Sequence, residues 1–181
     1  MPLPGEESDI SDIAEEADIA EEADIAEEAK SVLERLLAEM GVVASVTLQD
    51  KAPVEVEEGT IAPIALDIKG DDLGILIGRR GQALSYLQYI VRLIIAHQTK
   101  TRVPIIIDVE GYKQRRYEAL QALAVRLAEQ VKARGVPFSL EPMSAYERRI
   151  IHITLADHPD VTTQSIGEGE ARKVVILPKE Q

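Results

Sequence analysis

Residues 78–81, with the sequence GRRG, combine backbone freedom with positive charge in a way that suits an anion. Glycine adopts positive φ and, because it has no Cβ, allows a ligand to approach its backbone. Arg79 and Arg80 can donate bidentate hydrogen bonds to phosphate oxygens. A helical pattern begins at Gln82, and the unpaired N–H groups at the start of a helix favour a phosphate. We therefore predict that this segment, the GRRG turn (Gly78, Arg79, Arg80 and Gly81), binds phosphate.

Apolar residues lie beside the GRRG turn and would form the floor of a groove for bases: Ile75, Ile77 and Leu84. A plain turn between two helices, with solvated arginines, is the alternative interpretation. The turn differs from other phosphate loops, because the sequence contains neither G-x-x-x-x-G-K-[ST] nor G-x-G-x-x-G after a strand. The pattern G-x-x-G is therefore informative only together with the elements around it.

The elements that must position this turn follow from the hydrophobic periodicity. We expect helix over 27–41, strands over 42–49 and 61–70, a short helix over 71–77, a longer helix over 82–97 and a strand over 103–109. Residues 50–60 read as a polar connection. Asp71 is the expected N-cap of the short helix. The expected buried stripe of the longer helix is Leu84, Leu87, Val91 and Ile94.

This order of elements, with I-G-R-R-G-x-x-L between two helices, resembles the KH domain in its type II arrangement. The resemblance covers about residues 30–110, and we predict a KH domain over 26–110. It implies that the G-x-x-G loop clamps four backbone nucleotides. The implied RNA-binding residues of this domain are Ile77, Gly78, Arg79, Arg80, Gly81 and Leu84.

A second basic site is predicted at Arg148 and His152, which share a face of a helix because they are four residues apart. Arg149 lies beside them. A surface helix with a solvated histidine is the alternative. Ser144 and Glu147 have the spacing of a capping box and favour a helix over 144–159, although the alternation within 150–156 also fits a strand.

The elements around this second site are a long helix over 111–135, a short strand within 137–143, and two strands around a Gly-Glu-Gly turn within 160–178. The predicted fold class is therefore α+β, with two small α/β-sandwich domains at 26–110 and 111–181.

The segment "MSAYERRIIH" followed by "QSIGEGEARKVVI" resembles the R-three-H domain, which is named for its Arg-x-x-x-His motif. Arg148 and His152 match that motif, and Arg172 and Lys173 match the basic pair after the glycine turn. Lys173 stands where the pattern has arginine, which keeps the charge but loses the bidentate geometry. The resemblance implies that the RNA-binding residues of this domain are Arg148, Arg149, His152, Arg172 and Lys173.

A KH domain joined to an R-three-H domain resembles the bacterial Jag family, also called KhpB. The resemblance implies a non-catalytic protein that binds single-stranded RNA and acts as an RNA chaperone or post-transcriptional regulator linked to cell elongation and envelope homeostasis. It also implies a small KH-only partner similar to KhpA. A protein–protein adaptor that works with such a partner, or near the membrane insertase whose gene often neighbours the family, is the alternative. Acidic repeats stand here in place of the usual Jag-N domain.

The negative charge of the chain is concentrated at its start. Residues 1–29 hold eight Glu and four Asp and no Lys or Arg, which accounts for the whole net charge of −12. Residues 12–29 are three DIAEEA hexads, and a six-residue period places their isoleucines on different faces of a helix. We expect a disordered or partly helical tail over 1–25, which serves either solubility or as an intramolecular mimic of nucleic acid.

Composition excludes several other functions. The sequence has no cysteine, so disulfides and thiolate metal sites are excluded and a cytoplasmic location is expected. We expect no signal peptide and no membrane span. His97, His152 and His158 lack the spacing of a metal site, and no catalytic triad or carboxylate pair can be recognised. We therefore predict no metal, no cofactor and no enzymatic activity.

Overall fold

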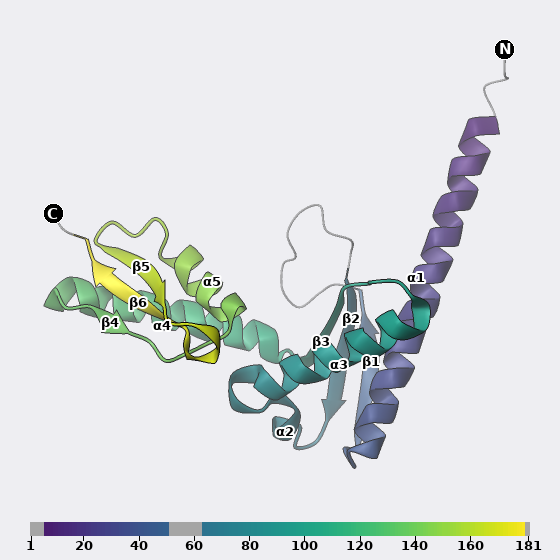
Figure 1. The fold of residues 1–181 in the computed structure, drawn as a ribbon, viewed down its shortest axis with the longest axis horizontal. Helices are drawn as coiled ribbons and strands as arrows, with labels where there is room; N and C mark the ends of the chain where they lie inside the picture. The colour runs from purple at the N-terminus through teal and green to yellow at the C-terminus, as the bar shows by residue number, and fades with distance from the viewer. Residues whose placement is uncertain (1–5, 51–62, 180–181) are drawn as a thin grey trace. The chain divides into compact units, whose positions relative to one another are not determined.

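The computed structural model describes residues 6–50 and 63–179, which divide into two compact units on either side of the Gly111–Tyr112 bond (Figure 1). The predicted polar connection lies almost entirely outside these residues. The first unit begins with one long helix, α1 (Glu6–Glu39), which runs through the acidic hexads. Ala and Glu favour helix, which explains this continuity. Among the side chains described in α1, burial begins at Ile25 and continues at Ala29, Val32, Leu33 and Leu37.

A three-stranded sheet forms the centre of the first unit. Strand β1 (Ala44–Gln49) pairs antiparallel with β2 (Ile64–Gly70), which pairs parallel with β3 (Ile105–Val109). The sheet order is β1-β2-β3. Most side chains of β2 and β3 are buried, among them Ile64, Leu66 and Ile68 of β2. Helix α1 contacts β1, and α3 contacts β3 (Figure 1). A parallel connection needs a crossover, and the helices that carry the GRRG turn provide it.

The crossover contains α2 (Gly74–Ile77), a 3-10 turn η1 (Arg79–Gly81) and α3 (Gln82–Thr99). Two sequence predictions about these helices are wrong. The N-cap of α2 is Leu73 rather than Asp71, because positive φ at Asp72 delays the start of the helix. The last residue of the buried stripe of α3 is Ile95 rather than Ile94, because the stripe follows the i+4 step from Val91.

Side chains of α3 cover the outer edge of β3. The amide oxygen Oε1 of Gln88 accepts a hydrogen bond from the N–H of Ile107 (3.0 Å). The guanidinium Nε of Arg92 donates to the carbonyl oxygen of Ile105 (2.7 Å). Burial lowers the pKa of Arg92. These contacts occupy backbone groups that would otherwise pair with an added strand.

The second unit places two helices on one face of a second sheet. Helices α4 (Tyr112–Arg134) and α5 (Ala145–Thr154) pack on each other and on strands β5 (Val161–Ile166) and β6 (Lys173–Pro178). The short strand β4 (Phe138–Ser139) pairs with β6. The sheet order is β4-β6-β5 and both pairings are antiparallel. The turn η2 (Gly169–Ala171) lies between β5 and β6. The core of the second unit comprises Leu120, Ala124, Leu127, Ala128, Val131, Leu140, Ile150, Ile151, Leu155, Val161, Val174 and Ile176.

The two units together consist of helices and two small sheets, which confirms the predicted α+β class.

The start of α5 is fixed by the predicted capping box. The Ser144 hydroxyl accepts from the N–H of Glu147 (3.2 Å), and the Glu147 carboxylate accepts from the N–H of Ser144 (3.3 Å). The other carboxylate oxygen of Glu147 accepts from Nε of Arg116 on α4 (2.7 Å). The cap therefore fixes α5 as a helix and ties it to α4, and the alternative of a strand within 150–156 is excluded.

Candidate nucleic-acid interface

The first glycine of the GRRG turn has a conformation that few other residues adopt. Gly78 has φ 66° and ψ −165°, a region that is essentially restricted to glycine. A Cβ at this position would lie 2.7 Å from the Cβ of Ala83 and 3.1 Å from its nitrogen. Both the backbone angles and the close approach of α3 therefore require glycine at position 78.

The two arginines of the turn are exposed, whereas Gly81 is buried. Arg80 (φ 55°, ψ 34°) and Gly81 (φ 77°, ψ 12°) are both left-handed, and the side chains of Arg79 and Arg80 are exposed. Gly81 is the N-cap of α3 and has no side chain to occupy the first N–H groups of that helix. The hydroxyl of Ser85 donates to the carbonyl oxygen of Gly81 (3.0 Å) and braces the turn. Two cationic side chains and a helix N-terminus thus converge on one turn.

The apolar residues beside the turn have different environments. Leu84 is 1% exposed and lies in the core beneath the turn, so it supports the turn from inside the domain. Ile77 is half-buried, and Ile75 is 74% exposed. The apolar surface beside the GRRG turn therefore comes from Ile75 and Ile77.

In the second unit, the ring of His152 is held at both nitrogens by hydroxyls of β5. Nδ1 lies 2.6 Å from Oγ1 of Thr163, and Nε2 lies 2.8 Å from Oγ of Ser165. Nη1 of Arg148 also donates to Oγ of Ser165 (3.4 Å). The predicted Arg-x-x-x-His pair is therefore bridged by one serine hydroxyl. Sequence reasoning did not identify Thr163 and Ser165, although their two-residue spacing on a strand places them on one face.

The other three predicted residues of this domain lie in different places. Arg172 precedes β6 and is exposed, and its charge acts on His152. Lys173 pairs with Ile166, whereas Ser165 pairs with Val174, so Lys173 is on the opposite face of the sheet from the histidine. Arg149 is exposed on α5. The structure thus brings Arg148, His152 and Arg172 together and does not add Lys173 to them.

His152 is expected to make the second unit less stable in acid. Its pKa is lowered first by burial and then by the positive charges of Arg148 and Arg172. The unfolded chain, where the histidine pKa is about 6.5, binds the proton more readily. The free energy of unfolding is therefore expected to be highest above pH 6.5 and to fall as the pH drops through 6.5 toward the lowered folded pKa. Calorimetric unfolding between pH 7.5 and 5 measures this loss.

His152→Gln is expected to flatten that pH dependence, since it removes the titrating group. His97→Gln serves as the control, because His97 is exposed near the end of α3 in the other unit. An equal slope in the wild type and the His152→Gln variant would contradict this assignment.

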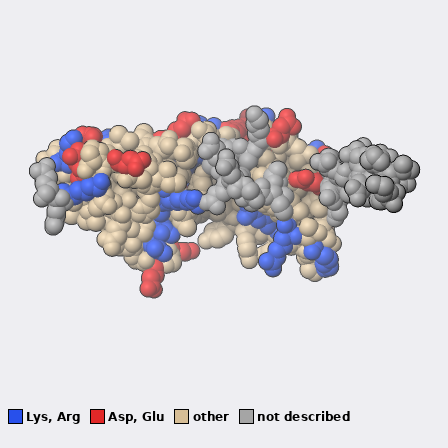
Figure 2. Space-filling view, turned by 90° about the horizontal axis from the view of Figure 1, so that it is seen from above, with Lys and Arg blue, Asp and Glu red and all other residues tan. Residues whose placement is uncertain are grey.

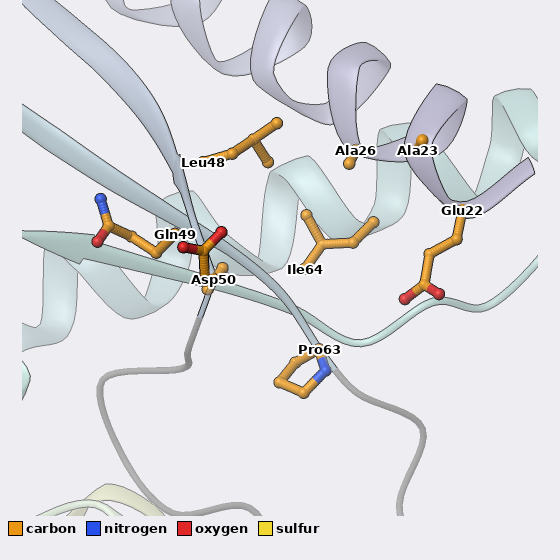
Figure 3. A pocket seen from close by; sticks show the side chains of 9 residues that line it. Glu22, Ala23, Ala26, Leu48, Gln49, Asp50, Pro63 and Ile64 are labelled. Atoms are coloured by element: carbon orange, nitrogen blue, oxygen red, sulfur yellow. The ribbon is translucent and has the colours of Figure 1, made fainter. Parts of the chain in front are cut away.

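The first unit has a pocket of about 290 Å³ between α1 and the ends of β1 and β2 (Figure 3). Its wall includes the carboxylates of Glu22 and Asp50, which repel phosphate. None of the residues predicted to bind RNA lines it. Its lining residues are Glu22, Ala23, Ala26, Leu48, Gln49, Asp50, Pro63, Ile64 and Ala65.

Basic side chains form several separate groups on the face shown in Figure 2, so positive patches occur on a chain of negative net charge. Residues 78–181 contain 16 basic and 11 acidic side chains, a net charge of +5. A local patch influences the choice of partner more than the overall charge does. Within the described residues, no helix combines the length and apolarity needed to cross a membrane.

Comparisons with known proteins match both units. Residues 30–107 match the KhpA/KhpB KH domain family, and residues 118–178 match the R-three-H domain family. A Clostridium symbiosum protein named RNA-binding protein KhpB is 45% identical over 116 residues, which cover 64% of this chain and 52% of that protein. A Bacillus subtilis protein of the same name is 37% identical over 131 residues, which cover 71% of this chain and 62% of that protein.

The chain thus spans between half and two thirds of the length of these relatives. The matched regions contain the GRRG turn and the Arg148–His152 pair, each in the fold that the sequence predicts. With its KhpA/KhpB-type KH domain followed by an R-three-H domain, the chain belongs to the KhpB/Jag family.

Proposed function

We propose that this protein is a non-catalytic RNA-binding protein of the cytoplasm that holds single-stranded RNA at two sites. The observation that carries the proposal is the geometry of the GRRG turn, where left-handed backbone, two exposed arginines and the start of α3 meet. A phosphate can contact the backbone there while the arginines supply full positive charges. The names of the relatives, RNA-binding protein KhpB, support the same ligand.

The second site of the proposal is formed by Arg148, His152 and Arg172. Two weak sites on one chain act through effective concentration, so their joint affinity exceeds that of either site. Unstacked bases of single-stranded RNA suit binding modules of this kind. Through such binding, the protein would act as an RNA chaperone or post-transcriptional regulator in cell elongation and envelope homeostasis, as the family resemblance implies.

Crosslinking in cells followed by sequencing of the bound RNA tests the proposal. RNA recovered with the wild-type chain, and lost when Arg79 and Arg80 are changed together to Asp, is the expected result. Equal recovery with both chains would remove the GRRG turn from RNA binding.

The acidic segment is expected to compete with RNA for the basic surfaces. Residues 1–21 carry eight of the twelve acidic side chains of residues 1–29. Ile25 and Ala29 are core residues, so a truncation must end before them. Deletion of residues 1–21 is expected to tighten RNA binding at low salt by a few fold, and the gain should vanish at high salt because screening removes the competition. Fluorescence anisotropy with labelled single-stranded RNA measures it.

The matched control for this deletion keeps the length of the segment and changes its Glu and Asp to Gln and Asn. Competition by charge predicts the same gain in affinity for both variants. Unchanged affinity in both would leave the segment with a solubility role.

The outer face of α3 favours a second candidate function, a protein–protein adaptor that pairs with a KH-only protein. Tyr86, Tyr89, Ile90 and Leu93 are spaced along one face of the helix and are 45% to 61% exposed. This face is opposite the buried stripe, and a helix that is apolar on both faces commonly has a partner on each.

Ile90→Asp combined with Leu93→Asp tests the adaptor function. Both side chains are exposed, so the fold should tolerate the changes. The adaptor predicts that the wild-type chain co-purifies with a KH-only protein after nuclease treatment and that the double variant does not. The variant with Asp at positions 79 and 80 is the control, because it should keep the protein partner while it loses RNA. Loss of co-purification on nuclease treatment of the wild type would contradict the adaptor.

A further inference from the structure

The hydroxyl of Ser165 is the one atom that contacts both residues of the Arg-x-x-x-His pair among the hydrogen bonds of the described residues. It accepts from Nη1 of Arg148 at 3.4 Å and lies 2.8 Å from Nε2 of His152. Ser165 is on β5, and the pair is on α5. A contact between two elements thus sets the spacing of two side chains that α5 alone leaves free to rotate.

The chemistry of the three groups gives this contact a direction. A guanidinium has donors and no acceptor, so the Ser165 oxygen must accept from Arg148. The single proton of the serine hydroxyl is then available for Nε2 of His152. When Nε2 accepts that proton, the ring carries its own proton on Nδ1, which lies 2.6 Å from Oγ1 of Thr163. The donors and acceptors form one chain from Arg148 through Ser165 and His152 to Thr163, in which each bond polarises the next.

Among the described residues, internal hydrogen bonds do not use the full donor capacity of the Arg148 guanidinium. Within the described part of the protein, Nε of Arg148 is buried and has no hydrogen-bond partner. A buried donor without a partner costs free energy of folding. Internal hydrogen bonding alone therefore does not explain the position of this guanidinium. The groups that face His152 are Arg148, Arg172, Thr163 and Ser165, and the two cations make the site attractive to phosphate.

We infer that Ser165 is a positioning residue for RNA binding: its hydroxyl holds Arg148 and His152 in one arrangement and fixes the Nδ1-protonated tautomer of the histidine. This inference rests on the proposed function of the second site. Ser165 acts through the pair and contacts no RNA itself. Thr163 completes the arrangement at the other ring nitrogen.

The first test uses the wild-type chain and needs no substitution. Long-range ¹⁵N–¹H NMR of the histidine rings at pH 7.5 distinguishes the two tautomers. The expected result for His152 is a protonated Nδ1 and an unprotonated Nε2. A ring protonated mainly on Nε2 would overturn the inference.

The second test compares variants of the full chain in RNA binding and in the same NMR experiment. Ser165→Ala is expected to weaken RNA binding about fivefold, as loss of one hydrogen bond implies, and to give His152 a mixture of tautomers. Ser165→Thr, which retains the hydroxyl, should keep the RNA affinity and the single His152 tautomer of the wild type. Thr162→Ala is the matched control, because Thr162 is an exposed residue of the same strand.

Arg148→Ala separates failure of this inference from failure of the proposed function. If Arg148→Ala weakens RNA binding and Ser165→Ala leaves both affinity and tautomer unchanged, the positioning role is wrong and the site stands. If Arg148→Ala leaves RNA binding unchanged, the second site does not bind RNA, and the inference fails with it.

Discussion

Replacing Arg79 and Arg80 together by Asp is expected to weaken the binding of single-stranded RNA about a hundredfold at low salt. Each charge-assisted hydrogen bond contributes about 1.5 kcal/mol, which is about tenfold in affinity, and the new carboxylates add repulsion. The salt dependence should fall as well. Loss of two phosphate contacts on a single strand reduces the slope of log K against log salt by about 1.4. Anisotropy titrations at salt concentrations from about 50 to about 300 mM measure both the RNA affinity and its salt dependence.

The control for this variant places the same charge change at the other end of α3. Lys100 and Arg102 are exposed and follow that helix, so changing both to Asp alters the net charge equally in the same unit. The control pair should lower affinity far less than the pair in the GRRG turn. Equal losses would mean that RNA responds to the net charge of the domain rather than to a clamp.

Gly78→Ala is expected to lower the free energy of unfolding by about 2–4 kcal/mol, the sum of backbone strain and overpacking. The new Cβ would lie 2.7 Å from the Cβ of Ala83, and the backbone angles of Gly78 are in a region restricted to glycine. Chemical denaturation measures the loss. RNA affinity of the fraction that remains folded should fall too, because α3 must shift to admit the methyl group.

Gly74→Ala is the matched control for this substitution. Gly74 is the first residue of α2, and a Cβ there would meet nothing within 4 Å. Alanine at this position is therefore expected to be neutral or to stabilise the protein by up to about 1 kcal/mol. Similar losses of stability in the two variants would show that the close approach of Ala83 does not require glycine at position 78.

Much of the fold follows from local sequence patterns. The alternation Ile64, Leu66, Ile68 and the capping box of Ser144 and Glu147 were sufficient to predict β2 and α5. The wrong predictions concern residues whose role depends on the surrounding fold as well as on their residue type. Asp71 is a good cap by residue type, but the path of the chain through Asp72 moves the helix start to Gly74. Ile94 and Ile95 are equally apolar, and only the packing of α3 selects Ile95.

The candidate sites were predictable in part, for a related reason. GRRG is a contiguous motif, so its glycines and arginines could be recognised, whereas the backbone angles of Gly78 depend on its contact with Ala83. The role inferred for Ser165 could not be recognised, because it depends on contacts with residues 13 and 17 positions away along the chain. No local period links a strand to a preceding helix across a loop. The opposite orientation of Lys173 likewise follows only from the register of β5 and β6.

The covered edge of β3 matters most when many molecules bind to one RNA. Chains held along one strand of RNA experience a high local concentration, and an open sheet edge at that concentration would invite strand-to-strand polymerisation. Gln88 and Arg92 already satisfy the N–H of Ile107 and the carbonyl of Ile105. At this edge, molecules crowded along one RNA would therefore not seed β-aggregates, and the same helix that begins at the GRRG turn provides the protection.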